Sequence, residues 1–181
     1  MKGNARLAIK VLELLGGSFA LSFERGRKRR RKLHEGCDVI WATLDRKQLY
    51  QVLERCKLQG LIRVIREGNR IENIRLTNKG RARALQNHLR TLRINSPQRW
   101  DKKWRLVIFD IPEKKRNVRD AFRRKLKELG FFEFQKSVFA YPYPCDDEIN
   151  FVSNFLGAEE YVYTIEAPLH PDGRLRKHFN V

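Results

Sequence analysis

The sequence has few cysteines and no long apolar run. Its three cysteines, Cys37, Cys56 and Cys145, are far apart, form no CxxC pair and have no clustered histidines beside them. This pattern excludes a disulfide framework and offers no zinc-site spacing, so we expect reduced thiols. No stretch approaches the ~18 consecutive apolar residues of a membrane span, and the N-terminus lacks the regions of a secretory signal. We therefore expect a cytoplasmic protein without a membrane partner.

Acidic residues are scarce in the first part of the chain. Residues 1–100 contain 24 Lys and Arg against 8 Asp and Glu, a net charge of +16, whereas residues 101–181 contain 15 against 13, a net charge of +2. A positive field attracts polyanions, and solubility alone requires no such asymmetry. The charge therefore predicts that the N-terminal part binds nucleic acid. An anionic membrane is a poorer partner, because no basic amphipathic helix carries exposed Trp, Phe and Leu opposite its charges.

A helix that leads directly into a hairpin predicts the fold of the N-terminal part. Helical spacing runs from near Asp45 to Gly60, and Gln48 is placed to complete a capping box with Asp45. Two apolar strands follow, at residues 61–66 and 71–76, joined by a turn at residues 67–70. We expect a winged helix-turn-helix domain over residues 1–93, followed by a linker at residues 94–101.

Apolar side chains at helical spacing predict the core of this domain. A first helix lies in residues 4–15, and the buried face of the helix after Asp45 consists of Leu49, Val52, Leu53 and Cys56. Cys56 is accordingly expected to be a small core side chain. Thr77 is placed to cap a closing helix, whose apolar stripe is predicted to be Ala82, Leu85, Leu89 and Leu92.

Three groups of side chains are the candidate DNA-binding residues. One is a run with seven Lys or Arg in nine positions, the second is the outer face of the helix after Asp45, and the third flanks the hairpin tip. A helix face rich in Arg, Lys, Gln and Tyr suits the major groove, and a hairpin tip suits phosphate or the minor groove. An ordinary solvated surface is the alternative for each group. The candidates are Arg25, Arg27, Lys28, Arg29, Arg30, Arg31 and Lys32; Arg46, Lys47, Tyr50, Gln51 and Arg55; and Arg66 and Arg70.

The C-terminal part, residues 102–181, reads as a ferredoxin-like domain. Strands and helices are predicted in the order βαββαβ, which is the ferredoxin-like arrangement. Their expected positions are a strand at 104–109, a helix from Pro112 to Gly130, strands at 132–136 and 138–141, a helix at 146–156 and a strand at 161–166. The whole chain is therefore expected to be an α+β protein.

Four segments carry resemblances to known families. Residues 58–62, LQGLI, and residues 76–81, LTNKGR, resemble winged-helix regulators in general. Residues 103–131, KWRLVIFDIPEKKRNVRDAFRRKLKELGF, resemble the central domain of the PaaX family of transcriptional repressors. Residues 135–142, QKSVFAYP, resemble the QxSVF segment of the CRISPR-associated endonuclease Cas-two family, whose fold that central domain shares.

The PaaX resemblance implies a DNA-binding transcriptional regulator of repressor type. We expect double-stranded DNA as its partner, with the ferredoxin-like domain forming a homodimer that places two winged helices on a palindromic site. No cofactor is expected for this function. RNA binding is a further alternative.

The endonuclease resemblance implies a second function, centred on Asp110. In that family an aspartate at the end of the first strand is associated with a divalent metal across a dimer interface, and Asp110 is the matching position. The protein would then be a magnesium-dependent nuclease, or an adaptation-complex scaffold whose partner is a spacer integrase. A carboxylate before a helix also suits helix capping or a favourable interaction with the helix dipole, so we expect Asp110 to have a capping or fold-maintaining role ahead of any catalytic or metal-binding role.

Overall fold

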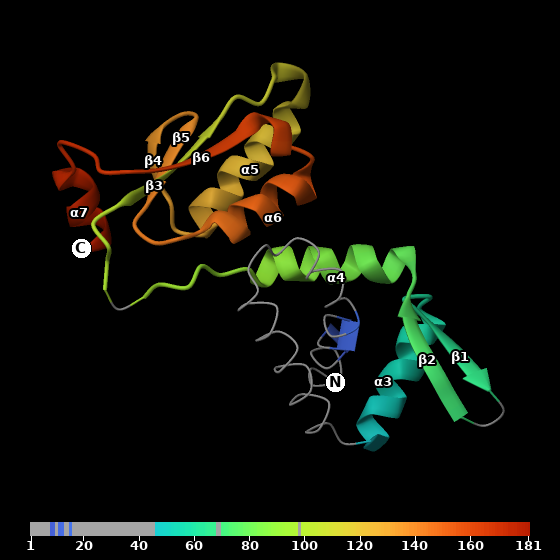
Figure 1. Ribbon diagram of the computed structural model, residues 1–181. Coiled ribbons are helices and arrows are strands. Elements are labelled where there is room, and N and C mark those ends of the chain that lie inside the picture. The colour runs from blue at the N-terminus through green and yellow to red at the C-terminus, as the bar shows by residue number, and fades with distance from the viewer. Residues whose placement is uncertain (1–7, 10, 13–14, 16–45, 68–69, 98) are drawn as a thin grey trace. The chain divides into compact units, whose positions relative to one another are not determined.

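The structure is a computed structural model that describes residues 8–9, 11–12, 15, 46–67, 70–97 and 99–181 (Figure 1). The chain separates into two compact units, Met1–Thr91 and Leu92–Val181, here called the N-terminal and C-terminal units. Helices and strands occur in both, so the predicted α+β composition is confirmed. Among the described residues, no helix is long and apolar enough to cross a membrane.

The N-terminal unit contains a helix, a hairpin and a second helix in that order. Its elements are α3 (Arg46–Leu58), β1 (Ile62–Glu67), β2 (Arg70–Leu76) and α4 (Asn78–Thr91). Residues 8–9, 11–12 and 15 are also helical. The two strands extend one residue further toward the tip than predicted, so that Glu67 and Arg70 pair with each other instead of forming part of the turn.

The end of α3 is set by a glycine. The N–H of Gly60 donates to the carbonyl oxygen of Lys57 at 2.9 Å, and the N–H of Leu61 donates to that of Cys56 at 2.9 Å. These two bonds form a Schellman motif, which requires a left-handed residue at the position of Gly60, and its φ is +67°. The motif reverses the chain immediately before β1, so only three residues separate α3 from the hairpin.

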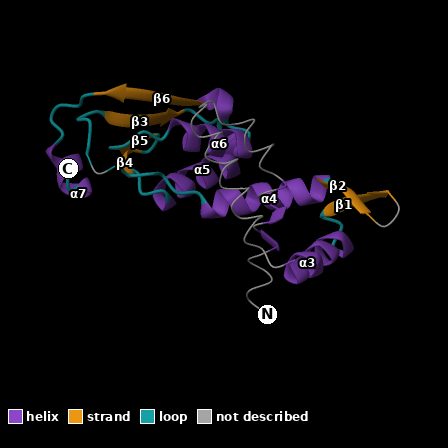
Figure 2. Ribbon diagram, turned by 60° about the horizontal axis from the view of Figure 1, so that its bottom comes forward, coloured by secondary structure: helices purple, strands orange, loops and turns teal. Residues whose placement is uncertain are grey.

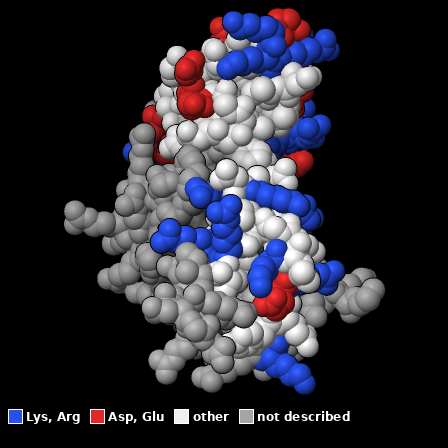
Figure 3. Space-filling view, turned by 90° about the vertical axis from the view of Figure 1, so that its right-hand side faces the viewer, with Lys and Arg blue, Asp and Glu red and all other residues white. Residues whose placement is uncertain are grey.

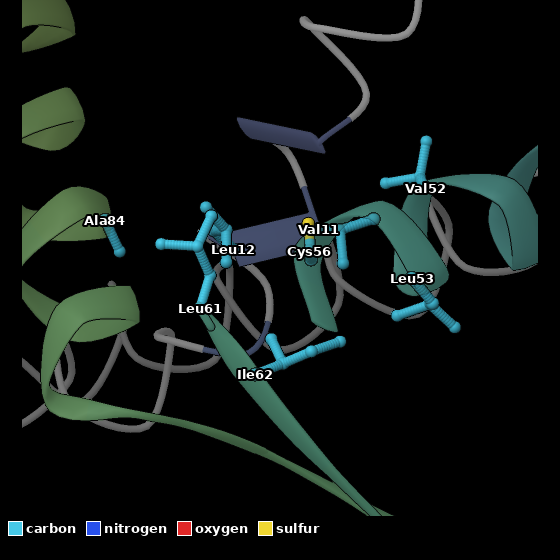
Figure 4. Packing of buried hydrophobic residues seen from close by; sticks show 8 residues of the cluster. All are labelled: Val11, Leu12, Val52, Leu53, Cys56, Leu61, Ile62 and Ala84. Atoms are coloured by element: carbon cyan, nitrogen blue, oxygen red, sulfur yellow. The ribbon is translucent and has the colours of Figure 1, made fainter. Parts of the chain in front are cut away.

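The core of the N-terminal unit joins all of these elements (Figure 4). Its buried residues are Val11, Leu12, Val52, Leu53, Cys56, Leu61, Ile62 and Ala84. The predicted buried face of α3 is confirmed, with Cys56 only 1% exposed. The prediction for Ala82 was wrong, because Ala82 is exposed and Ala84 is buried. The close approach of α4 to Leu61 explains the difference, since it places Gly80 and Ala84, one turn apart, on the inner face.

The C-terminal unit has the predicted order βαββαβ. Its four strands form one antiparallel sheet in the order β4-β5-β3-β6. The elements are β3 (Trp104–Phe109), a 3-10 turn η1 (Glu113–Lys115), α5 (Arg116–Glu128), β4 (Phe132–Gln135), β5 (Val138–Tyr141), α6 (Asp146–Leu156), a 3-10 turn η2 (Glu159–Tyr161), β6 (Val162–Ala167) and α7 (Gly173–Phe179). Sequence reasoning missed α7, whose seven residues are too few for a clear helical period.

The two faces of this sheet are covered differently. Phe109 packs against Phe122 of α5, with ring centroids 5.2 Å apart, so the alternate residues of β3 that include Phe109 face the helices. On the opposite face, Trp104 and Ala140 form a cluster with Leu175 of α7. Both ribbon views place α7 apart from α5 and α6 (Figures 1 and 2). The helices α5 and α6 therefore cover one face, and α7 covers part of the other.

Candidate nucleic-acid interface

The outward side of α3 carries a stripe of polar side chains. Lys47, Gln51 and Arg55 are spaced four residues apart and are all exposed, so they lie along one line of the helix. Tyr50, beside this stripe, is 55% exposed. The opposite side of the same helix supplies Val52, Leu53 and Cys56 to the core. The inner side of α3 is packed in the core, and the polar stripe lies on the opposite, exposed side of the helix.

Hydrogen bonds connect the N-terminus of α4 to the segment at the end of α3. The hydroxyl of Thr77 accepts a hydrogen bond from the N–H of Gly80 at 3.0 Å and contacts the carbonyl oxygen of Gly60 at 2.7 Å. The predicted capping role of Thr77 is therefore confirmed. Lys79 donates to the carbonyl oxygen of Gln59 at 3.0 Å, so its ammonium group provides a hydrogen bond to a carbonyl group just after the end of α3.

The hairpin presents two further arginines that sequence reasoning did not select. Arg63 on β1 is the direct cross-strand partner of Arg75 on β2, and both are exposed. Their neighbours Ile62, Val64, Ile74 and Leu76 pack on the core from the other face. The alternation of apolar and basic residues in the two predicted strands was the signal that could have placed each of these arginines on the outer face, although it does not give their pairing.

Basic side chains also extend along α4. Arg81, Arg83 and Arg90 are exposed, although Arg90 donates to Asn87 at 3.3 Å. Figure 3 shows that, among the described residues of the N-terminal unit in the lower half of the view, blue Lys and Arg side chains outnumber the red acidic ones. This face of the unit is suited to a polyanion.

Several candidate residues cannot be placed. The run from Arg25 to Lys32 lies outside the described residues, as does Asp45. The backbones of Arg46, Arg66 and Arg70 belong to α3, β1 and β2, but their side chains are not among those the structure describes. Their roles in DNA binding stay predictions.

Acidic groups neutralise many of the basic residues of α5. Arg119 pairs with Glu113 at 2.8 Å, and Arg116 pairs with Asp120 at 3.7 Å. Arg123 and Lys127 both pair with Glu133 of β4. Hydrogen bonds from Lys127 and Arg123 lower the pKa of the Glu133 carboxyl. These cations are engaged within the unit and offer less free charge to a polyanion.

Asp110 lies at the end of β3 with an exposed side chain. Its N–H donates to the carbonyl oxygen of Tyr161 at 3.0 Å. The predicted capping role of Asp110 was wrong. Pro112 is the residue at the N-cap of the 3-10 turn η1, and Lys115 is the residue at the N-cap of α5. Neither N-terminus has a side-chain capping hydrogen bond. The intervening Ile111 and Pro112 extend the chain and carry the turn beyond the reach of a cap from Asp110.

The described side chains around Asp110 do not form a cluster of metal ligands. Within the described residues, no three His, Cys, Asp or Glu side chains lie close enough together to hold a metal ion. Magnesium usually keeps several waters and takes one or two carboxylates plus substrate phosphate. An Asp110 from each of two copies would supply two carboxylates.

A buried arginine organises the start of the C-terminal unit, and sequence reasoning missed it. Arg105 is 4% exposed and donates to both carboxylate oxygens of Asp101, at 2.7 and 2.5 Å. It also donates to Glu166 at 3.2 Å and to the carbonyl oxygen of Pro142 at 2.9 Å. The hydrogen bonds from Arg105 lower the pKa of Asp101 to about 2. This cluster joins the segment before β3 to β5 and β6, which indicates a structural role.

The sheet order, the helices on one face and the βαββαβ connection define the C-terminal unit as a ferredoxin-like α+β domain. Residues 97–178 match the protein-family model described as the PaaX protein central Cas2-like domain. The C-terminal unit is therefore a PaaX-type central domain, and the resemblance predicted from residues 103–131 is confirmed. No curated protein sequence matches the chain.

Proposed function

We propose that this protein is a PaaX-type transcriptional repressor that binds double-stranded DNA through a winged helix in its N-terminal unit. The observation that carries the proposal is the exposed stripe of Lys47, Gln51 and Arg55 on α3, directly followed by the hairpin of β1 and β2. Lysine and glutamine can read base edges, and a helix supported by a core from behind fits the major groove. The recognition helix is therefore α3, and the hairpin is the wing.

The charge distribution supports assigning DNA binding to the N-terminal unit. The N-terminal unit, residues 1–91, contains 22 Lys and Arg against 8 Asp and Glu, a net charge of +14, whereas residues 92–181 contain 17 against 13, a net charge of +4. In the C-terminal unit, the basic residues of α5 are largely paired with Glu113, Asp120 and Glu133. Phosphate binding depends on cations that are available to displace counterions, and the N-terminal unit supplies most of them.

The C-terminal unit supplies the dimer contact in this proposal. On the sheet face that α7 partly covers, Leu106 of β3 lies opposite Ile165 of β6, and Ile108 lies opposite Tyr163. Ile165 is 46% exposed and Tyr163 is 61% exposed. An apolar surface of this kind is typical of an interaction site. A second copy presenting the same face would bury both, and the resulting two-fold symmetry would match a palindromic operator.

A footprint on the DNA upstream of the protein's own gene tests the proposal. The full-length protein is incubated with the labelled upstream region and an excess of random duplex competitor. We expect a protected site with two-fold symmetry that survives the competitor, because base-edge contacts favour one sequence over bulk DNA. Equal competition by random duplex would contradict sequence-specific repression.

The match to a Cas2-like domain and the exposed position of Asp110 favour a metal-dependent nuclease as the second candidate. Single- and double-stranded DNA and RNA are incubated with magnesium and either the wild-type protein or Asp110→Ala. Cleavage that is lost in the variant would support the nuclease. Equal cleavage by both proteins, or none by either, would remove it. Competition between RNA and DNA ligands in the same buffer separates RNA binding from DNA binding.

A further inference from the structure

The outer face of the hairpin brings two arginines together. Arg63 and Arg75 are direct partners across the antiparallel strands, and opposite side chains in such a pair have Cβ atoms about 5 Å apart. Both side chains are exposed. Because the inner face carries Ile62, Val64, Ile74 and Leu76, the alternation of the strands directs both arginines away from the core.

This arrangement does not stabilise the isolated hairpin. Like charges directly opposite each other on a sheet are destabilising. Within the described part of the chain, neither Arg63 nor Arg75 forms an ion pair, in contrast to Arg119 and Arg123 of α5. Among the described side chains, no carboxylate pairs with either arginine to relieve this repulsion. A ligand that carries negative charge would relieve it.

We propose that Arg63 and Arg75 together bind the phosphate backbone of duplex DNA, a role that rests on the DNA-binding function proposed above. A guanidinium donates two parallel hydrogen bonds to phosphate oxygens, and two adjacent guanidinium groups can hold neighbouring phosphates. The hairpin follows α3 after only three residues and packs on the same core, so both elements belong to one rigid support. The pair orients α3 on the duplex without reading its sequence.

The double substitution Arg63→Thr with Arg75→Thr tests this proposal. Threonine favours strands and forms a favourable cross-strand pair, so the hairpin is retained while two charges are removed. We expect the slope of log affinity against log salt concentration to fall in magnitude by about 1.8, which corresponds to two phosphate contacts. The loss should be the same on a preferred site and on random duplex. We also expect the melting temperature of the free protein to stay the same or rise, because the repulsion is gone.

Two further variants separate the proposal from a general charge effect. Lys114→Gln with Arg124→Gln removes one exposed charge from η1 and one from α5, for which the described residues show no ion pair, and should leave the slope unchanged. Arg63→Lys with Arg75→Lys keeps the charges and should keep the wild-type slope. An equal loss of slope in the glutamine variant, or a loss in the lysine variant as large as in the threonine variant, would overturn the proposal.

The proposal and the proposed function fail in different ways. If the wild-type protein binds duplex DNA and the threonine variant binds it with the same salt dependence, only the role of Arg63 and Arg75 is wrong. If the wild-type protein does not bind duplex DNA, both are wrong. If it binds single-stranded RNA in preference, duplex DNA is not the ligand of the pair.

Discussion

Gly80 of α4 lies directly against the backbone of Leu61. A Cβ atom built on Gly80 would stand 1.9 Å from the carbonyl oxygen of Leu61, far inside van der Waals contact. The N–H of Thr77 donates to the same oxygen at 3.0 Å. The position therefore requires a residue without a side chain, although the φ of Gly80 is not in the left-handed region.

Substitution of Gly80 by alanine should destabilise the N-terminal unit. Relief of the contact requires α4 to move away from Leu61 and Ala84 to leave the core, which we expect to cost about 3 kcal/mol of unfolding free energy. Urea denaturation followed by circular dichroism measures the change. Gly173→Ala is the matched control, because nothing lies within 4 Å of its added Cβ. Equal stability of both variants would contradict the packing of α4 on Leu61.

Changes to the recognition helix and to the basic run should affect DNA binding differently. Gln51→Ala should remove about 1–3 kcal/mol of discrimination at one base position, because a lost base contact affects one sequence more than another. Neutralising Arg27 to Lys32 should weaken all sequences alike and flatten the salt dependence. Binding titrations on a preferred and a random duplex, at several salt concentrations, distinguish the two. Identical effects of both changes would contradict the assignment of α3 as the recognition helix.

The contact between Asp101 and Arg105 should make the stability of the C-terminal unit depend on pH. The pKa of Asp101 is lowered to about 2 in the folded protein, against about 3.9 in an unfolded chain. A lowered pKa contributes stability that is present above the unfolded value and is lost as the pH falls toward the folded value. The wild-type protein should therefore exceed Asp101→Asn in unfolding free energy at pH 5, and the difference should shrink between pH 4 and pH 2.

Tryptophan fluorescence can follow this unfolding. Trp100 and Trp104 lie in the C-terminal unit, and a Trp41→Phe background removes the remaining tryptophan of the chain. A difference between the two proteins that stays constant from pH 5 to pH 2 would show that the carboxylate of Asp101 contributes nothing through its charge.

The apolar pairs of the sheet should control self-association. Ile165→Glu places a charge where a second copy would bury the side chain, so we expect a dimer to become a monomer. Because Ile165 is 46% exposed, the fold of a single copy should be little affected. Sedimentation velocity measures the mass of each protein, and Thr164→Glu on the same strand is the control, since its side chain points to the other face. A wild-type protein that stays monomeric at micromolar concentration would contradict the dimer.

Local patterns predicted most of the elements because their causes are local. The periodicity of Leu49, Val52, Leu53 and Cys56, the glycine after α3 and the cap at Thr77 each depend on residues within one or two turns. The order βαββαβ followed from the same kind of signal, and the match of residues 97–178 to a PaaX central domain agrees with it. The charge contrast between the two parts of the chain needed only a count.

Other features depend on residues that meet only after folding. Ala84 replaces Ala82 in the core because α4 approaches Leu61 at Gly80, and no periodicity within α4 reveals which side Leu61 occupies. Asp110 is not a cap because the helix start is displaced beyond Pro112. Arg105 reads as an ordinary strand residue, yet it is buried because a carboxylate 61 residues away, on Glu166, joins Asp101 to neutralise it.

The sequence by itself determined the α+β composition, the succession of elements, the PaaX-type central domain and the concentration of positive charge in the first 100 residues. The PaaX-type domain follows from the resemblance of residues 103–131, and the other features follow from local periodicity, turn chemistry and a charge count. Only the tertiary structure decided that Arg63 and Arg75 stand opposite each other on an exposed face, that Gly80 must lack a side chain and that Arg105 is buried. The register of a hairpin, the approach of a helix to another backbone segment and the environment of a charge are set by contacts between distant residues, which a local pattern does not contain.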